Sequence, residues 1–296
     1  MEITQGIPMA IPFGLLALSM ITVWLPPLAL GKACRMPAWL LLFAAASTSA
    51  LATGYLEWSA LPTLAFFLTA AFLGSHPEAG QIQRTLFSIL TALTALALAL
   101  HLLPGFNNPV LLSGVRLSPD AAPLMQYANF DKGAAGLVLL AWFCNRTTSA
   151  WEWKEIGRKI PVIILVTTAS VLIAAVLMHY LHFQPKLPAF TPVFLAANLF
   201  FTCVAEEAFF RGFLQERITS SLSQFRPGVI IAILCSGLLF GLAHAAGGVS
   251  YMLLATMAGL GYASAYARVR RIEAAIITHF IVNTTHFIGF TYPHAA

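Results

Sequence analysis

Residues 203–214, "CVAEEAFFRGFL", place three charged side chains in an otherwise apolar part of the chain. Glu206 and Glu207 are adjacent carboxylates, and Arg211 follows four residues after the second. The flanking stretches, "FTPVFLAANLFFT" before and "RPGVIIAILCSGLLFGLAH" after, are almost wholly apolar. Ionisable side chains are costly inside a membrane and are usually functional there. We therefore expect this segment to form part of a site.

The composition is typical of a membrane protein. Of the 296 residues, 59% are hydrophobic and 9% are charged, whereas a soluble domain carries about 25% charged residues. The mean hydropathy of the whole chain is +0.81. These values predict an all-α fold, a polytopic membrane helical bundle. The cysteines lack Cys-x-x-Cys spacing, which argues against a disulfide framework and against a zinc–cysteine site. They are Cys34, Cys144, Cys203 and Cys235.

Ten apolar runs are candidates for membrane-spanning helices, which need about 20 mostly apolar residues. They are residues 7–30, 37–55, 58–74, 85–104, 133–145, 160–182, 190–214, 228–246, 249–267 and 273–292. The run 133–145 is too short to cross alone at about 1.5 Å per residue, so it either borrows residues from 124–132 or is re-entrant. The sequence therefore predicts eight to ten transmembrane helices.

The basic residues predict an orientation. If the N-terminus lies outside and all ten runs cross, one side collects Lys32, Arg35, Arg84, Arg146, Lys154, Arg158, Lys159, Arg217, Arg226, Arg268, Arg270 and Arg271. The other side collects Arg116, Lys132 and Lys186. Because cytoplasmic loops carry the excess of Lys and Arg, we expect the basic loops in the cytoplasm. The compact loops are typical of a bacterial inner (plasma) membrane protein. The net charge of +5 then reflects orientation and contact with the lipid bilayer, not nucleic-acid binding.

Two polar connections indicate how the chain is divided. Residues 104–132 are rich in Pro, Asn and Asp and are expected to face the outside. Residues 151–159, "WEWKEIGRK", are charged and aromatic, which indicates an interfacial segment. We expect N-terminal transmembrane helices of unknown role in 1–150 and a core in 151–296 that carries the unusual polar residues.

Two more polar patterns interrupt the apolar C-terminal half. "FGLAH" places Phe240 and His244 four residues apart, and "HFIVN" does the same for His279 and Asn283. Residues four apart share one helix face. A lone histidine in an apolar helix is usually a hydrogen-bonded packing residue. The histidines to which we give this structural explanation are His101, His179 and His286.

The spacing of the charged residues also separates the two acids. Glu207 and Arg211 share a helix face and are expected to pair. Glu206 lies about 100° round the helix and is predicted to be unpaired. One free acid, two imidazoles and one amide on three helices together indicate function rather than packing.

The motifs "EEAFFR", "FGLAH" and "HFIVN" resemble, in this order, those of the CAAX-protease and bacteriocin-processing (Abi) family of intramembrane proteases. That family has the patterns E-E-x-x-x-R, F-x-x-x-H and H-x-x-x-N, and it includes the type II CAAX prenyl endopeptidases. A helix without a motif, 249–267, separates the second and third motifs, as in the family. The resemblance covers about residues 155–296 and implies an intramembrane endopeptidase acting on a membrane-anchored peptide or protein.

The residues suit this chemistry. A buried carboxylate can act as a general base, so Glu206 is predicted to activate a water molecule that His244 holds or polarises. His279 and Asn283 are predicted to stabilise the oxyanion, which needs preorganised donors. The supporting residues are Glu207 and Arg211, which brace the first helix, and Phe240, which shapes the wall beside His244.

Several alternatives stay open. Glu206, His244 and His279 could hold zinc and leave a position for water, although the chain lacks the His-Glu-x-x-His arrangement. Because asparagine is a poor zinc ligand, we favour a glutamate-type mechanism with no cofactor. The scaffold could also serve a transporter, since membrane acids and histidines build proton relays, or a non-catalytic immunity protein. The complete motifs and the lack of an internal repeat favour the protease.

Overall fold

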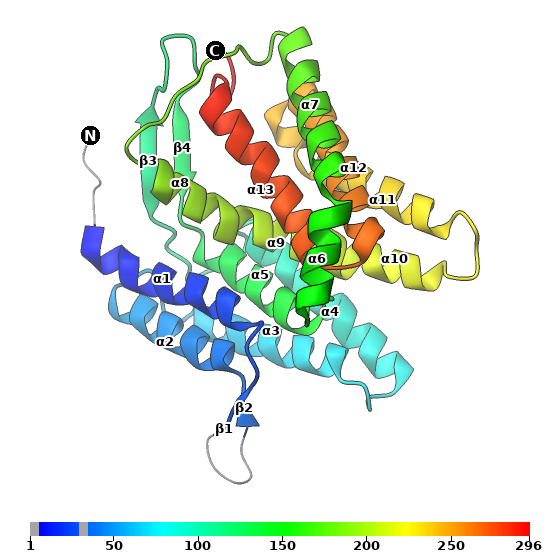
Figure 1. Cartoon of the computed structure of the whole chain (residues 1–296). Helices are drawn as coiled ribbons and strands as arrows, with labels where there is room; N and C mark the ends of the chain where they lie inside the picture. The colour runs from blue at the N-terminus through cyan, green and yellow to red at the C-terminus, as the bar shows by residue number, and fades with distance from the viewer. Residues whose placement is uncertain (1–5, 30–34) are drawn as a thin grey trace. The chain divides into compact units, whose positions relative to one another are not determined.

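The computed structural model describes residues 6–29 and 35–296 and is mostly helical (Figure 1). Each of the ten predicted apolar runs overlaps a helix. Lys32 and Cys34 lie outside the described residues. The chain divides into two compact units. Unit 1 comprises the residues up to Leu112, Gln126–Cys144 and Phe200–Phe209, and unit 2 comprises Ser113–Met125, Asn145–Leu199 and Phe210–Ala296.

Unit 1 is built around a short buried helix. Its helices are α1 (Gly6–Thr22), α2 (Ala38–Ala52), α3 (Ala60–Ser75), α4 (Gln81–Ala99) and α5 (Phe130–Trp142). Helix α5 packs against α1, α3, α4 and α9 (Val204–Glu207), and ten of its 13 residues are buried. At 1.5 Å per residue it is about 20 Å long, shorter than the roughly 30 Å of a bilayer core. Its length and burial are typical of a core helix.

Unit 2 is organised by α12 (Val249–Val269). This helix packs against α7 (Pro161–Leu177), α11 (Gly228–Ala243) and α13 (Ile272–Gly289) (Figure 1). A 3₁₀ turn, Ala245–Gly247, connects α11 to α12. Helix α6 (Ala150–Lys159) precedes α7 and begins at the N-cap Ser149, whose hydroxyl accepts from the backbone N–H of Glu152. Trp151 and Trp153 on α6 are exposed, as expected of the predicted interfacial segment.

The structure contains short strands, which the predicted all-α fold did not include. Strands β1 (Leu28–Ala29) and β2 (Arg35–Met36) pair antiparallel, and β3 (Val110–Val115) and β4 (Leu124–Tyr127) form a second two-stranded sheet. The second sheet lies within the polar connection 104–132. Extended backbone satisfies its own hydrogen bonds by strand pairing, so a polar connection need not be irregular.

The helix that carries the charged motif is not a regular α-helix. It runs from α8 (Thr191–Asn198) to α10 (Glu216–Ser221). Two π-helical segments, Leu199–Cys203 and Ala208–Gln215, lie on either side of α9, which contains both glutamates. A π-helix bonds residue i to residue i+5 and occurs frequently at functional sites. The α-helical spacing assumed for Glu207 and Arg211 therefore does not apply to the turn that joins them.

Length and apolarity identify only some helices as membrane spans. Among the described residues, α4 and the helix over Thr191–Ser221 are long and apolar enough to cross, and α6 with α7 would make a third if this pair, bent by 44°, is one span. Shorter apolar helices are Met9–Thr22, Ala38–Ala52, Ala60–Ser75 and Gly228–Ala243. The membrane character agrees with the prediction, and the number of eight to ten spans stays a prediction.

Candidate active site

Glu206 is not the unpaired acid that the sequence predicted. Its Oε1 atom lies 2.7 Å from Nζ of Lys132 in α5, and both side chains are mostly buried, at 13% and 17% exposure. Both residues belong to unit 1. The prediction was wrong because Lys132 lies 74 positions away in sequence, which no helical spacing rule covers. Lys132 ends the polar connection 104–132 of the sequence, and it lies in the first turn of α5.

Arg211 is a fully buried cation in unit 2, with 0% of its surface exposed. Its Nη2 donates to the carbonyl oxygen of Gly259 at 2.8 Å. The guanidinium carbon lies 4.6 Å from the ring centroid of Phe240 and 5.4 Å from that of Tyr262. A guanidinium is attracted to aromatic faces at such distances. Arg211 thus ties the charged helix to α11 and α12.

The two predicted imidazoles lie in one aromatic cluster of unit 2. The Phe240 ring centroid is 4.6 Å from that of His244 and 5.8 Å from that of His279. His279 is 4% exposed and stacks on Tyr262 at 4.4 Å, with ring planes 13° apart. His244 and His279 are therefore both neighbours of one side chain, that of Phe240.

His244 has a defined orientation at the end of α11, where it is the C-cap residue. Its Nδ1 lies 2.7 Å from the carbonyl oxygen of Phe240. Because a carbonyl oxygen only accepts hydrogen bonds, Nδ1 carries the proton, and Nε2 of the neutral ring is an acceptor. This tautomer suits His244 to accept a hydrogen bond from water through Nε2.

Asn283 has a polar partner that the sequence analysis missed. Its Nδ2 donates to Oδ1 of Asn198 at 3.3 Å. Asn198 ends α8 and is 7% exposed. A single amide in the apolar run 190–202 is a signal that could have identified it. Tyr262 was also missed, since nothing in its spacing distinguishes it from a packing residue.

Close helix packing explains how α11 and α12 form this cluster. A Cβ atom added to Gly241 would lie 1.8 Å from Oγ1 of Thr256, and one added to Gly237 would lie 2.6 Å from a side-chain carbon of Leu260. Small residues four apart let helix backbones approach closely in membranes. The pair Gly237 and Gly241 therefore permits the contact that positions Phe240.

Other polar residues have structural partners. His286 Nε2 lies 3.1 Å from the carbonyl oxygen of Thr291, and His101 Nδ1 lies 2.7 Å from Asp131 Oδ2. These bonds agree with the structural explanation given to both histidines. Among the described cysteines, Cys144, Cys203 and Cys235 form no disulfide bond. Over the described part of the chain, no group of three His, Cys, Asp or Glu side chains is arranged to hold a metal ion.

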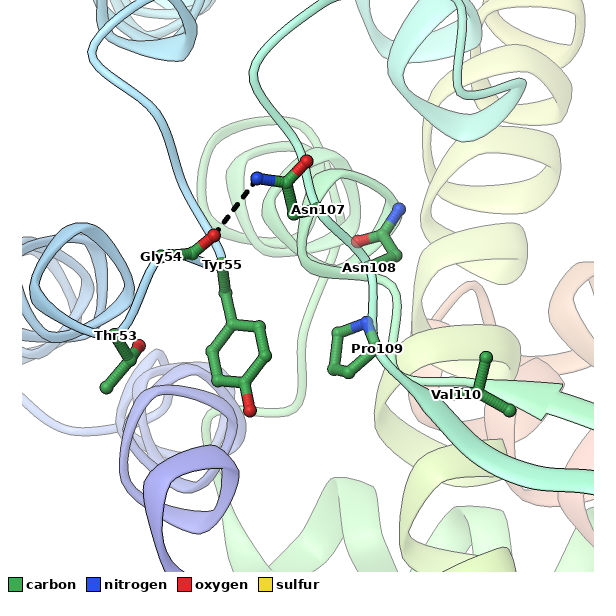
Figure 2. A pocket seen from close by; sticks show the side chains of 7 residues that line it. All are labelled: Thr53, Gly54, Tyr55, Asn107, Asn108, Pro109 and Val110. Atoms are coloured by element: carbon green, nitrogen blue, oxygen red, sulfur yellow. Dashed lines mark hydrogen bonds between the residues drawn. The ribbon is translucent and has the colours of Figure 1, made fainter. Parts of the chain in front are cut away.

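A separate open hollow of about 630 Å³ lies in unit 1 (Figure 2). Its lining comes from the segments 53–55 and 107–110, and Asn107 Nδ2 bonds the carbonyl oxygen of Gly54 across it at 3.0 Å. No lining residue belongs to the three motifs. The hollow is therefore distinct from the candidate active site.

The fold and these side chains define a mostly helical membrane protein with buried acids, imidazoles and amides. Residues 188–285 match the family model of the type II CAAX prenyl endopeptidase Rce1-like proteins. This range contains every predicted site residue and about a third of the chain. No curated protein and no solved structure matches the chain. The match over residues 188–285 confirms the resemblance inferred from the motifs.

Proposed function

We propose that the protein is an intramembrane endopeptidase that hydrolyses a peptide bond of a membrane-anchored peptide or protein. The observation that carries the proposal is the cluster that gathers His244 and His279 around Phe240, inside the range that matches a protease family. The matched range includes the apolar helices Thr191–Ser221 and Gly228–Ala243, so the substrate is expected to reach the site from the bilayer.

In the proposed mechanism Glu206 is the general base. It takes a proton from water while the water oxygen attacks the peptide carbonyl carbon, and it returns the proton to the leaving amine. The lone pair on Nε2 of His244 accepts a hydrogen bond from the same water. His279 and Asn283 donate to the carbonyl oxygen as it becomes negatively charged, and such donors stabilise the transition state when they are fixed in advance.

The surroundings of the two donors support this role. His279 is held by its stack on Tyr262, and Asn283 by its bond to Asn198. Both contacts restrict rotation of the side chain, which is what a preorganised donor requires. Glu207, 0% exposed, is proposed to brace the helix together with Arg211.

A zinc-dependent version of the reaction remains the alternative. It would use Glu206, His244 and His279 as ligands, and zinc would act as the Lewis acid that activates a bound water. Asn283 is a better oxyanion donor than zinc ligand, which favours the metal-independent version.

The proposal is tested by incubating purified protein with a quenched library of membrane peptides. We expect cleavage by the wild type and loss of at least about a hundredfold in Glu206→Ala and His244→Ala, since a general base contributes roughly 10²–10⁴-fold. The matched controls are Glu78→Gln and His76→Asn, which change a solvent-exposed acid and a partly exposed histidine. Unchanged cleavage in Glu206→Ala removes the assignment. Loss of wild-type activity with a chelator, restored by zinc, selects the metal-dependent version.

A further inference from the structure

We infer that Lys132, which lies outside the range that matches the protease family, is a positioning residue for Glu206. The inference rests on the proposed function, because it assigns Lys132 the task of orienting the base. It also gives the N-terminal helices a role, since α5 then contributes to the active site.

The ion pair is the first observation. Nζ of Lys132 and Oε1 of Glu206 are 2.7 Å apart, with 17% and 13% of the side chains exposed. An isolated charge in such surroundings is strongly unfavourable, whereas a hydrogen-bonded pair is tolerated. Each charged group therefore stabilises the other in its mostly buried position.

The approach of α5 to the charged helix is the second observation. A Cβ atom added to Gly136 would lie 2.6 Å from the Cα atom of Ala205, the residue before Glu206. One added to Gly133 would lie 3.0 Å from the ring of Phe201. At Gly136 the obstructing atoms are the backbone and Cβ of Ala205, so α5 and the charged helix approach closely one turn after Lys132. This contact sets the short distance between Lys132 and Glu206.

The third observation is a network that fixes the first turn of α5. Asp131, 1% exposed, accepts from Nδ2 of Asn108 at 2.9 Å, and its Oδ2 lies 2.7 Å from Nδ1 of His101. Oδ1 of Asn108 accepts from the backbone N–H of Phe130 at 2.8 Å. Asn108 stands on the loop at the edge of the hollow in Figure 2. The backbone immediately before Lys132 is thus anchored.

These contacts explain what Lys132 supplies. A general base must be ionised and must present its carboxylate in one direction. The ammonium balances the negative charge, and its bond to Oε1 fixes the rotation of the carboxylate. Lys132 does not contact the reacting atoms in this scheme, and it acts through Glu206.

The activity arm of the test compares Lys132→Met, Lys132→Arg and the exposed control Lys154→Met in the peptide-cleavage assay. We expect kcat to fall by on the order of tenfold to a hundredfold in Lys132→Met with little change in KM, because substrate contacts are intact. Lys132→Arg, which keeps the charge, restores most of the rate, and Lys154→Met equals the wild type. Lys132→Gln replaces the Met variant if that variant does not fold.

A second arm does not depend on catalysis. It is a double-mutant cycle on the thermal midpoint with Lys132→Met, Glu206→Gln and the double variant. We expect each single change to lower the midpoint, and the double change to lower it by less than the sum, which is the signature of a direct interaction. Additive shifts of the thermal midpoint would show that Lys132 and Glu206 do not interact, which overturns the inference.

The outcomes separate the two proposals. A wild type that cleaves, with an unchanged rate in Lys132→Met, overturns the positioning role and leaves the proposed function standing. A faster Lys132→Met also overturns it, since Lys132 would then block the base. A wild type that cleaves no peptide overturns the proposed function, and the thermal cycle still decides whether Lys132 and Glu206 are coupled.

Discussion

The rings of Tyr262 and His279 stack face to face, with centroids 4.4 Å apart and planes inclined by 13°. Tyr262 belongs to α12, the helix that carries none of the three motifs. The stack covers one face of the imidazole, and the edge-on ring of Phe240 lies 5.8 Å from it. The N–H bonds of an imidazole lie in its ring plane, so the stack fixes the plane in which His279 donates hydrogen bonds. The helix without a motif thus orients one of the proposed oxyanion donors.

The first prediction concerns this stack. Tyr262→Leu removes the aromatic ring but keeps an apolar side chain, whereas Tyr262→Phe keeps the ring. Because an aromatic pair is worth about 0.5–1.5 kcal/mol beyond its buried area, we expect kcat in peptide cleavage to fall roughly 2- to 10-fold in Tyr262→Leu. Tyr262→Phe is expected to retain most of the rate. Equal rates in both variants would show that the ring does not orient His279.

The helices themselves follow from local sequence. Apolar runs bounded by Gly, Pro and charged residues predicted where each helix lies, as the observed Gly228–Ala243 helix within the run 228–246 illustrates. The i, i+4 rule also placed His279 and Asn283 together on α13. These features depend on residues a few positions apart, so the sequence contains the information directly.

Features that depend on distant residues were not predictable in this way. The pair of Lys132 with Glu206 joins positions 74 apart, and its main sequence signal is the spacing of Gly133 and Gly136 after the lysine. The π-helical segments around Glu206 change the helical phase. No residue type in these segments predicts a π-helix. The short α5 could be recognised as unusual, but its place at the centre of unit 1 follows from packing alone.

The second prediction tests the contact between α5 and the charged helix. Gly136→Ala introduces a Cβ atom 2.6 Å from the Cα atom of Ala205, and overpacking of this kind costs about 1–3 kcal/mol. We expect a lower thermal midpoint and a lower kcat, because α5 must move and carry Lys132 with it.

Gly157→Ala is the matched control for this substitution. Gly157 lies in α6, is exposed, and has open space where its Cβ atom would be. Replacing a helical glycine by alanine there is expected to be neutral or stabilising by up to about 1 kcal/mol. Similar midpoints for Gly136→Ala and Gly157→Ala would show that the backbones are not in close contact.

The third prediction concerns the start of α13, the helix that carries His279 and Asn283. Oε1 of Glu273 accepts from both the backbone N–H and the hydroxyl of Thr147, each at 2.7 Å, and both residues are buried. Thr147→Val removes the hydroxyl donor at nearly constant volume. Because a buried hydrogen bond to a charged group contributes about 1.5–3 kcal/mol, we expect the free energy of unfolding to fall by about 2 kcal/mol.

Thr148→Val provides the comparison for Thr147→Val. The hydroxyl of Thr148 bonds Oε2 of Glu152 at 3.2 Å, but on an exposed surface. An exposed interaction with a charge contributes about 0–1 kcal/mol, so this variant is expected to unfold close to the wild type in denaturant titrations. A loss in Thr148→Val as large as that in Thr147→Val would contradict the role given to burial at Glu273.

The last prediction separates the charge of Arg211 from its shape. Arg211 donates to the carbonyl oxygen of Gly259 and lies against the rings of Phe240 and Tyr262. Lysine keeps the charge but loses the planar group that fits between rings. A hydrogen bond from a charged donor and desolvated ring contacts are each worth about 2 kcal/mol. We expect Arg211→Lys to lower the free energy of unfolding by on the order of 3 kcal/mol.

The exposed Arg158 supplies the control for Arg211, because its ion pair with Glu155 is on the surface. Arg158→Lys is expected to change the free energy of unfolding by less than about 1 kcal/mol. The same variants are assayed for peptide cleavage at a temperature where all are folded. If Arg211 only supplies charge, Arg211→Lys retains both stability and kcat, and the aromatic contacts have no role. If its shape holds Phe240 beside both imidazoles, kcat falls together with the thermal midpoint in Arg211→Lys and is unaffected in Arg158→Lys.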